Sequence, residues 1–385
     1  MIKSAIGIIG ADKCASCFLC GDVCSKDAIV MKYDEEGFYK PFVNQDLCNN
    51  CGACALSCPV LHDEKKIPSF EKPKVFAAWN NDKEIRLKSS SGGIYYAMAQ
   101  WFLELGGYVC GVKWKNGNVI FDIAHNTEEL IPFLGSKYLQ ADASHIYSQI
   151  KNFLSQGKKI MFVGLPCQTQ ALSNIISNDN LFIVDLVCAG VPSYKIFKKY
   201  CDETFPTQSI DKVNFRSKRT GWRKYSIEYF SSNKAVFRNR AISDPFFNGF
   251  NTTMYYNKGC YTCKLNTLPR RAHITLCDYW GAKGMLDTRE GTSLILINDS
   301  IGQEWMDKFL QERGNQLFLI EQTYEAAVLG TKRIHMSSRL MPKERAEIFS
   351  LVDSLPFKEI CRKYFQPITL KGRVINRIKR VLKSL

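Results

Sequence analysis

The sequence of 385 residues contains no run of eighteen apolar residues, which is about the length that a helix needs to cross a membrane. Its first residues, Met1–Gly10, are too short for a secretory signal and lead directly into a cysteine-rich segment, so we expect a cytoplasmic protein. It has no Ser-His-Asp or paired-carboxylate signature of a hydrolase and no G-x-G-x-x-G dinucleotide-binding motif. Its chemistry must therefore rest on other residues.

Acidic residues are in short supply, because 37 Asp and Glu face 52 Lys and Arg and leave a net charge of +15. The excess avoids residues 1–70, which hold seven basic and nine acidic side chains. It is strongest in residues 362–385, which hold eight basic side chains and no acidic one. A positive field attracts nucleic acid, an acidic electron donor or an anionic membrane. No nucleic-acid recognition motif accompanies the charge, so we expect no nucleic-acid partner.

Cysteine, by contrast, is abundant, with sixteen residues. In a reducing cytoplasm these thiols indicate metal ligation rather than disulfides. The content of 45% apolar and 23% charged residues indicates a globular chain of two or three domains.

Eight of the cysteines form two copies of the spacing C-x2-C-x2-C-x3-C, the second followed by Pro59. This run is typical of bacterial two-cluster ferredoxins, in which the fourth cysteine of each copy binds the opposite 4Fe-4S cluster. The predicted ligands are Cys14, Cys17, Cys20 and Cys58 for one cluster, and Cys48, Cys51, Cys54 and Cys24 for the other. A zinc site or a disulfide framework is the alternative, but neither explains a triple C-x2-C-x2-C run that occurs twice.

The chain divides into regions that predict an α+β or α/β multidomain fold. We expect a ferredoxin-type domain at 1–67, a mixed α/β body at 74–150 and 151–345, and a helical basic tail at 346–385. The apolar pattern of the body predicts strands at 75–79, 160–163 and 181–187, a helix at 94–105, a hairpin of 108–114 with 119–124, and a β-rich region at 213–298. The first domain has almost no apolar core, so bound clusters would supply much of its folding energy.

Four further cysteines follow predicted strands or form a C-x2-C pair: Cys167, Cys188, Cys260 and Cys263. Ligands at the carboxyl ends of neighbouring strands point into one crevice, so this set predicts a third 4Fe-4S cluster, with a zinc site or free thiols as alternatives. Cys277 is a fifth candidate ligand. We expect the remaining cysteines to be small buried residues, namely Cys110, Cys201 and Cys361.

Two segments leave their interpretation open. The turn Ser89–Gly93 (SSSGG) precedes the predicted helix, where amides and hydroxyls suit a phosphate or a flavin edge, or serve only as a helix cap. The tail from Ile368 onward places apolar residues at helical spacing among basic ones. A basic amphipathic helix can lie on an anionic membrane, here the inner face, or dock on the protein's own body or a partner.

Several motifs follow one another in a fixed order. After the double cysteine run come Ser89–Gly93, Gly164–Gln168 (GLPCQ), Asp185–Ser193 (DLVCAGVPS), Gly221-Trp222, Cys260–Cys263 (CYTC), Ala272–Thr275 (AHIT) and Asp278–Gly281 (DYWG). In this order they resemble the coenzyme F420 hydrogenase/dehydrogenase beta-subunit family, as far as about Asn298.

The resemblance implies a flavin-binding body that holds FAD beside an iron-sulfur cluster. Clusters carry single electrons whereas hydride chemistry needs two, so a flavin is the natural converter between them. The implied function is an iron-sulfur, FAD-dependent oxidoreductase that exchanges electrons with a low-potential partner such as ferredoxin. The organic substrate would be F420 or, as bacterial members of the family often occur in surface-polysaccharide gene clusters, a metabolite of that pathway. The alternative is a non-catalytic electron-relay subunit of a larger redox complex.

For FAD we favour contacts from the serine-glycine turn and from cations and an aromatic residue beyond it: Ser90, Ser91, Gly92, Gly93, Lys137, Arg216, Lys218 and Trp222. Lys and Arg near a flavin stabilise its anionic reduced ring, and an aromatic ring can stack on it. The alternative for these residues is surface charge and core aromatics. Asp278 is a candidate general acid or base, or else a turn carboxylate that caps amides.

The chain departs from the family pattern in three places. Ala189 stands where a histidine is usual and Cys277 where a glycine is usual, which argues against F420 more than against FAD. Asn257-Lys258 stands where an arginine is common, which weakens an anion contact carried over from the family.

Overall fold

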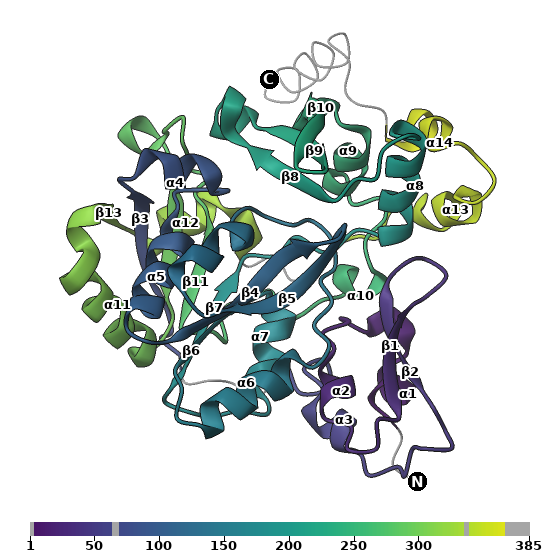
Figure 1. Ribbon diagram of the computed structural model, residues 1–385, viewed down its shortest axis with the longest axis horizontal. Coiled ribbons are helices and arrows are strands. Elements are labelled where there is room, and N and C mark those ends of the chain that lie inside the picture. The colour runs from purple at the N-terminus through teal and green to yellow at the C-terminus, as the bar shows by residue number, and fades with distance from the viewer. Residues whose placement is uncertain (1–3, 64–68, 335–338, 366–385) are drawn as a thin grey trace.

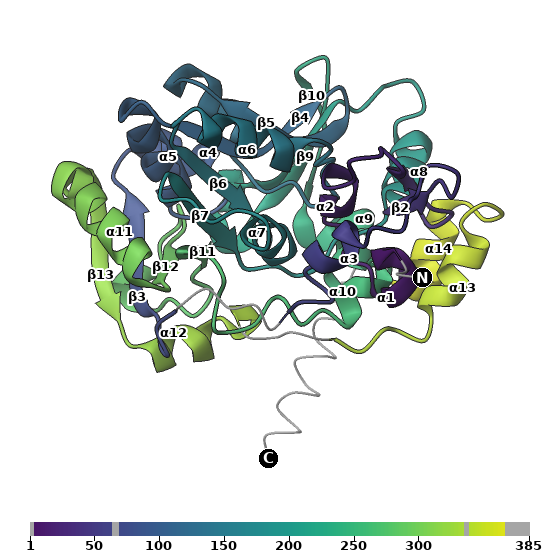
Figure 2. The ribbon, with the colours of Figure 1, turned by 90° about the horizontal axis from the view of Figure 1, so that it is seen from below.

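The computed structural model describes residues 4–63, 69–334 and 339–365. A small cysteine-rich module at the N-terminus lies beside a larger mixed α/β body (Figure 1, Figure 2). The basic helix predicted from Ile368 onward falls outside the described residues. Each helix within them is too short or too polar to cross a membrane.

The module, purple in Figure 1, consists of three short helices and one antiparallel hairpin: α1 (Ala5–Ile9), α2 (Leu19–Asp22), β1 (Ile29–Tyr33), β2 (Tyr39–Val43) and α3 (Ala53–Ser57). Its own buried apolar cluster is formed by Ala5, Ala55 and Cys58. Phe18 and Leu19, at the start of α2, pack instead into the core of the body. The module therefore depends on cysteine chemistry and on its neighbour more than on an interior of its own.

The body is built on one eight-stranded mixed sheet. In spatial order its strands are β13 (Leu317–Gln322), β3 (Lys74–Asn80), β12 (Ser293–Ile297), β11 (Ile274–Asp278), β7 (Leu181–Leu186), β6 (Ile160–Gly164), β4 (Tyr108–Lys115) and β5 (Asn118–Ala124). The four central strands β11, β7, β6 and β4 are parallel, and the outer pairs are antiparallel.

Helices cover both faces of this sheet. Successive residues of a strand point to opposite faces, and in β6 Met161 and Val163 join one core whereas Ile160 and Phe162 join the other. The first face is covered by α5 (Ile94–Glu104) and α11 (Ser300–Arg313), and the second by α6 (Ile146–Ser155) and α7 (Pro166–Ser173). Burial on both faces explains why the central strands are apolar at nearly every position.

A second, three-stranded antiparallel sheet lies on the side of the body toward α8, in the order β10 (Lys234–Arg240), β9 (Ser226–Ser231) and β8 (Lys212–Ser217). Four helices pack with it: α8 (Tyr194–Thr204), α9 (Pro245–Asn251), α13 (Arg345–Leu351) and α14 (Phe357–Tyr364). Three short helices complete the body: α4 (Lys83–Lys88), α10 (Lys258–Tyr261) and α12 (Tyr324–Gly330).

The predicted mixed α/β fold is confirmed, as are the strand at 75–79, the helix at 94–105 and the hairpin β4–β5. The strands predicted at 160–163 and 181–187 are β6 and β7, which pair in parallel. The boundary predicted between residues 150 and 151 falls between β5 and β6, which belong to the same sheet.

Candidate metal centres

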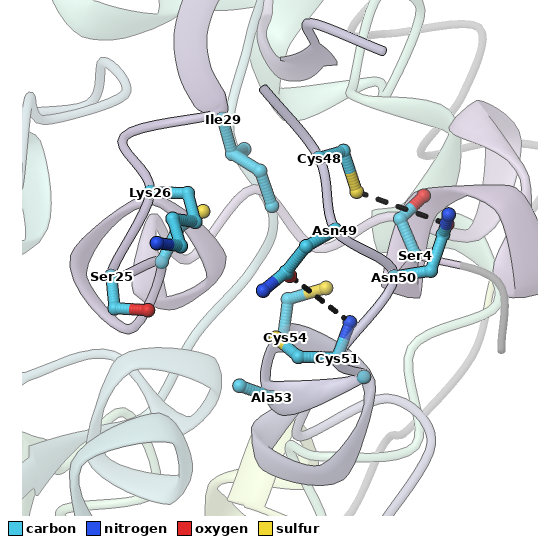
Figure 3. Close-up of a pocket in the computed structure, with 12 residues that line it drawn as sticks. Ser4, Ser25, Lys26, Ile29, Cys48, Asn49, Asn50, Cys51, Ala53 and Cys54 are labelled. Carbon is cyan, nitrogen blue, oxygen red and sulfur yellow. Dashed lines mark hydrogen bonds between the residues drawn. The ribbon is translucent and has the colours of Figure 1, made fainter. Parts of the chain in front are cut away.

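Two cavities in the module are each lined by four cysteines. Cys14, Cys17, Cys20 and Cys58 line the cavity nearer the body, and we call them the proximal set. Cys24, Cys48, Cys51 and Cys54 line the other cavity, and we call them the distal set (Figure 3). The fourth cysteine of each run thus lies with the first three of the other run, which is the arrangement that ferredoxin spacing predicts.

Backbone amides point at the sulfur atoms of both sets. The N–H groups donate from Ser16 to Cys14 (3.4 Å), from Ala28 to Cys24 (3.3 Å) and from Ala5 to Cys54 (3.4 Å). Such bonds favour the thiolate and tune the potential of a bound cluster. Burial acts in the opposite direction and raises the pKa of Cys17 and Cys58, so a metal must displace their protons. The donor atoms fit 4Fe-4S clusters.

A third group, which we call the body set, gathers Cys167, Cys188, Cys260 and Cys263. Cys167 lies in the first turn of α7, directly after β6, and Cys188 follows β7. Burial raises the pKa of Cys167 most, and the charges of the other three members raise it further. Burial also raises the pKa of Cys188 to about 11 and that of Cys260 to about 12. Four partly buried thiols within electrostatic reach of one another fit a metal cluster.

Cys277 lies in β11, in a different electrostatic environment. After burial, which is the largest cause, the charges that act on its pKa are those of Asp278, Arg270 and Asp185. Its surroundings therefore differ from those of the body set, and we do not include it there.

The three sets follow one another through the molecule. The charge of Cys54, in the distal set, raises the pKa of Cys20 and Cys58 in the proximal set, although burial is the larger cause. Cys17, in the proximal set, acts in the same way on Cys167 of the body set. Between them the Tyr147 hydroxyl donates to the Cys17 carbonyl at 2.6 Å.

The cysteines form neither disulfides nor, among the described residues, a site for a single metal ion. All sixteen are free thiols, so none forms a disulfide. In the described part of the chain, no group of three or more His, Cys, Asp or Glu side chains converges closely enough to bind a single metal ion. Cys110, Cys201 and Cys361 are buried as predicted.

Three buried cations gather near the end of β11, and one of them binds the carboxylate of Asp278. Arg216 donates to both oxygens of Asp278, at 2.9 and 3.1 Å, and Trp222 Nε1 donates to Oδ1 at 3.0 Å. Arg86 and Lys218 complete this cationic cluster, and all three cations are at most 7% exposed. Burial lowers the pKa of Lys218 to about 7, and the charges of Arg216 and Arg86 lower it further while Asp278 raises it. The cluster suits an anionic group.

The predicted flavin turn is bonded within the protein. Ser91 Oγ donates to the Thr292 carbonyl (2.8 Å), the Gly92 amide donates to Ser293 Oγ (2.9 Å), and the Ser90 and Ser136 hydroxyls bond each other (2.8 Å). A Cβ on Gly92 would meet the Ala78 carbonyl at 2.4 Å, and Gly93, with φ of 84°, begins α5. The glycines therefore allow close packing on β3 and the start of the helix.

The predicted lysines also point at backbone carbonyls. Lys218 Nζ donates to the carbonyls of Arg86 (2.6 Å), Glu290 (2.6 Å) and Ser91. Lys137 Nζ donates to those of Phe133 (2.8 Å) and Leu134 (2.9 Å), and burial lowers its pKa to about 7. The Nε atom of Arg216 is buried and has no hydrogen-bond partner among the described residues, so its N–H can donate to a further anionic oxygen.

Two members of this site, Trp280 and Arg86, are not among the residues predicted from the sequence. The rings of Trp222 and Trp280 stack with their centres 4.8 Å apart. Trp222 is fully buried, whereas Trp280 is partly exposed. The guanidinium of Arg216 lies 4.9 Å from the ring centre of Trp280. Trp280 belongs to the DYWG motif and could have been found there, whereas Arg86 lies in a polar segment typical of a solvated helix.

Comparisons with known proteins agree with this division of the chain. Residues 157–319 match the family described as the C-terminal part of the beta subunit of coenzyme F420 hydrogenase/dehydrogenase, and residues 13–61 match the 4Fe-4S dicluster domain. A subunit of the F(420)H(2) dehydrogenase of Methanosarcina mazei is 24% identical over 327 residues, which cover 79% of this chain and 84% of that protein.

Two further relatives match smaller parts. The coenzyme F420 hydrogenase subunit beta of Methanococcus voltae is 24% identical over 66% of this chain and 81% of its own length. The ferredoxin-type protein NapF of Escherichia coli K12 is 50% identical over 44 residues, which cover 11% of this chain and 27% of that protein. Among solved structures, the F420-reducing [NiFe] hydrogenase complex from Methanosarcina barkeri has a chain similar at a TM-score of 0.47 and 18% identity, over 70% of this chain and 92% of that one.

Proposed function

We propose that this chain, which belongs to the coenzyme F420 hydrogenase/dehydrogenase beta-subunit family and carries a 4Fe-4S dicluster domain at its N-terminus, is an iron-sulfur flavoprotein oxidoreductase. It passes electrons between a low-potential partner such as ferredoxin and an organic substrate, either F420 or a polysaccharide-pathway metabolite. The observation that carries the proposal is the presence of three sets of four cysteines: the distal and proximal sets line two cavities of the module, and the body set includes the cysteines that directly follow β6 and β7.

Each cysteine set would hold one 4Fe-4S cluster, which supplies one-electron transfer when bound. The residues of this chain fix the order of the sets, and of the twelve cysteines only Cys51, in the distal set, is exposed. Cys17 and Cys167, on the two sides of the contact between the module and the body, are both partly buried. The protein's task in such a chain is placement and insulation.

The cationic cluster of Arg86, Arg216 and Lys218 would hold FAD or another anionic cofactor. The Nε of Arg216, which has no partner in the described part of the chain, and the partly exposed ring of Trp280 support this assignment. A bound flavin supplies conversion between one-electron and two-electron chemistry. Asp278 keeps Arg216 oriented, and it is the proposed general acid or base.

One observation favours the alternative of a non-catalytic relay subunit. The hydroxyls and amides of the turn at Ser90, Ser91 and Gly92 bond within the protein rather than facing a ligand. A relay subunit would hold clusters without a flavin or a substrate of its own.

Anaerobic purification followed by iron and flavin analysis tests the proposal. We expect about twelve irons and one FAD per chain, the sum for three 4Fe-4S clusters and one converter. A content of about eight irons without flavin would refute the flavoprotein and favour the relay subunit. An iron-free, colourless protein would refute both.

The body set is tested by a matched pair of substitutions. Cys263→Ser should remove about four irons and leave those of the module, because it deletes one ligand of a single cluster. Cys277→Ser should leave the iron content unchanged, since Cys277 has other neighbours. Equal iron in the two variants would show that the ligand set is wrong.

A further inference from the structure

Lys40 is a buried cation at the contact between the module and the body. It lies in β2 and is only 6% exposed. Its Nζ donates to the carbonyls of Ala11 (2.8 Å) and Cys14 (3.2 Å) and to Oδ1 of Asn257 (2.8 Å). None of these three acceptors is a carboxylate, so they satisfy the hydrogen bonds of the ammonium group without cancelling its charge. A buried charge held in this way needs a reason, because burial alone disfavours it.

The charge stands between two cysteine sets. Cys14 belongs to the proximal set, and its carbonyl also accepts from Asn257 Nδ2 at 3.3 Å. On the other side, Lys40 acts on Cys260 of the body set, where it lowers a pKa that burial raises. The backbone of the body also packs against this carbonyl. A Cβ added to Gly259, in α10, would meet the Cys14 carbonyl oxygen at 2.4 Å.

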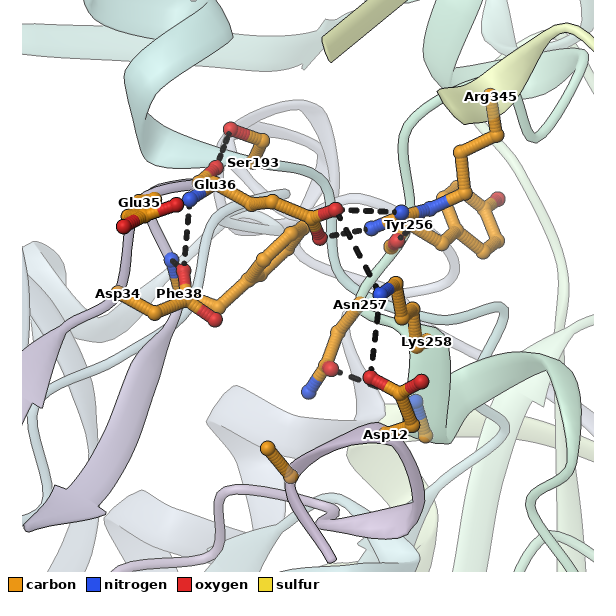
Figure 4. Close-up of polar contacts among 12 residues, drawn as sticks. Asp12, Asp34, Glu35, Glu36, Phe38, Ser193, Tyr256, Asn257, Lys258 and Arg345 are labelled. Carbon is orange, nitrogen blue, oxygen red and sulfur yellow. Dashed lines mark hydrogen bonds and ion pairs between the residues drawn. The ribbon is translucent and has the colours of Figure 1, made fainter. Parts of the chain in front are cut away.

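Ion pairs hold the module in this position. Arg345, which is 2% exposed, donates to both oxygens of Glu36, at 2.9 and 2.5 Å (Figure 4). Lys258 pairs with Asp12 at 3.1 Å, and the Ser193 hydroxyl donates to the Glu36 carbonyl at 2.5 Å. The turn that carries Glu36 joins β1 to β2, so these contacts fix the strand from which Lys40 extends.

We propose that Lys40 tunes electron transfer: its fixed positive charge raises the reduction potentials of the clusters that the proximal and body sets would hold. The inference rests on the proposed function, since it requires clusters on both sets. A cluster gains negative charge when it is reduced, so a nearby cation stabilises the reduced form. Salt screens such a buried charge far less than one at the surface. Raising both potentials together keeps the difference in reduction potential between the proximal and body clusters small. It also favours electron transfer from the distal cluster to the proximal one.

The test is a redox titration of the full chain, followed by electron paramagnetic resonance, with iron content measured on the same samples. Lys40→Met should lower the proximal and body potentials and leave the distal potential in place. We expect at least a tenfold change in each reduction equilibrium, which for one electron is about 59 mV. Lys40→Arg keeps the charge and should keep the potentials.

Lys32 offers a matched control, because it lies opposite Lys40 in the register of the β1–β2 hairpin but is exposed to solvent. Lys32→Met should leave all potentials unchanged. A Lys40→Met protein with full iron and unmoved potentials would overturn the inference, as would an equal shift in Lys32→Met. An iron-free wild-type chain would instead refute the proposed function.

Lys40→Met also removes the donor to three acceptors and could lose iron for that reason alone. A second variant decides that case. Asn257→Asp keeps an oxygen for the start of α10 and places a carboxylate against the ammonium group. It removes the Nδ2 donor to the Cys14 carbonyl, but that carbonyl still accepts from Lys40. Its charge should lower the same two potentials at full iron content. Unchanged potentials in Asn257→Asp would overturn the inference.

Discussion

The module and the body hold cysteines of the same kind by opposite means. In the module, two nearly continuous runs of sequence wrap around the cavities, and the separate apolar cluster is formed by Ala5, Ala55 and Cys58. In the body, ligand candidates from residue 167 to residue 263 are brought together by a sheet with apolar cores on both faces. The module's geometry is thus encoded locally, whereas that of the body set follows from the folding of the whole sheet.

The difference implies two sources of stability. A small domain that buries little apolar surface gains much of its folding free energy from bound metal. A sheet covered by helices gains it from apolar burial. Loss of metal and loss of packing should therefore damage different parts of the chain.

Iron removal should have the largest effect and should divide the molecule. Anaerobic chelation is expected to abolish amide protection across residues 4–63, because the module then lacks its main source of stability. Strands β6 and β7 should keep theirs, since their residues lie in the apolar cores. Hydrogen exchange with mass spectrometry measures both. Equal loss in module and body would mean that the clusters stabilise the chain as one unit.

Phe162→Ala tests the other half of the comparison. Phe162 is fully buried, and its ring lies 5.5 Å from that of Phe121. The cavity left behind should cost about 3–5 kcal/mol of the free energy of unfolding. Phe42→Ala, in the module and 47% exposed, should cost no more than about 0.5 kcal/mol. Denaturant unfolding of both variants decides, and similar losses would contradict a division based on packing.

The same contrast explains how much could be predicted from the sequence. The two cysteine runs, the hairpin β4–β5 and the strands β6 and β7 were found because their signals lie within short segments. The order of the sheet was not, since β3 lies between β13 and β12, which follow it by more than 200 residues. No local pattern specifies such pairings.

Charged residues show the limit most clearly. Lys137 and Lys218 were assigned to a flavin by their charge, yet both direct their ammonium groups at backbone carbonyls. Lys40 gave no signal at all, because its partner Asn257 is 217 residues away. The departure from the family pattern at Asn257-Lys258 marks the place where the body contacts the module, through Lys40 and Asp12. Its meaning emerges only from the fold.

The contact between the two regions supplies a smaller effect. Glu36→Gln removes one charge of the pair with buried Arg345, while Glu36 itself is 25% exposed. Removing one partner of a fully buried pair costs several kcal/mol, so at this partly solvated pair we expect about 1–2 kcal/mol. Faster hydrogen exchange in the β1–β2 hairpin would be the measure. Asp353→Asn, which breaks the exposed pair with Lys195, serves as control and should change little.

The smallest effect should come from Lys72→Ala, which removes an exposed ion pair with Glu325 at 2.9 Å. Both side chains are more than 60% exposed, so solvent screens the attraction and the melting temperature should not change measurably. Thr323→Ala, at the start of the same helix α12, removes a cap on the Ala326 amide and should cost about 1 kcal/mol. If Lys72→Ala lowered the melting temperature as much as Thr323→Ala, surface charge would have to join apolar packing among the sources of stability of the body.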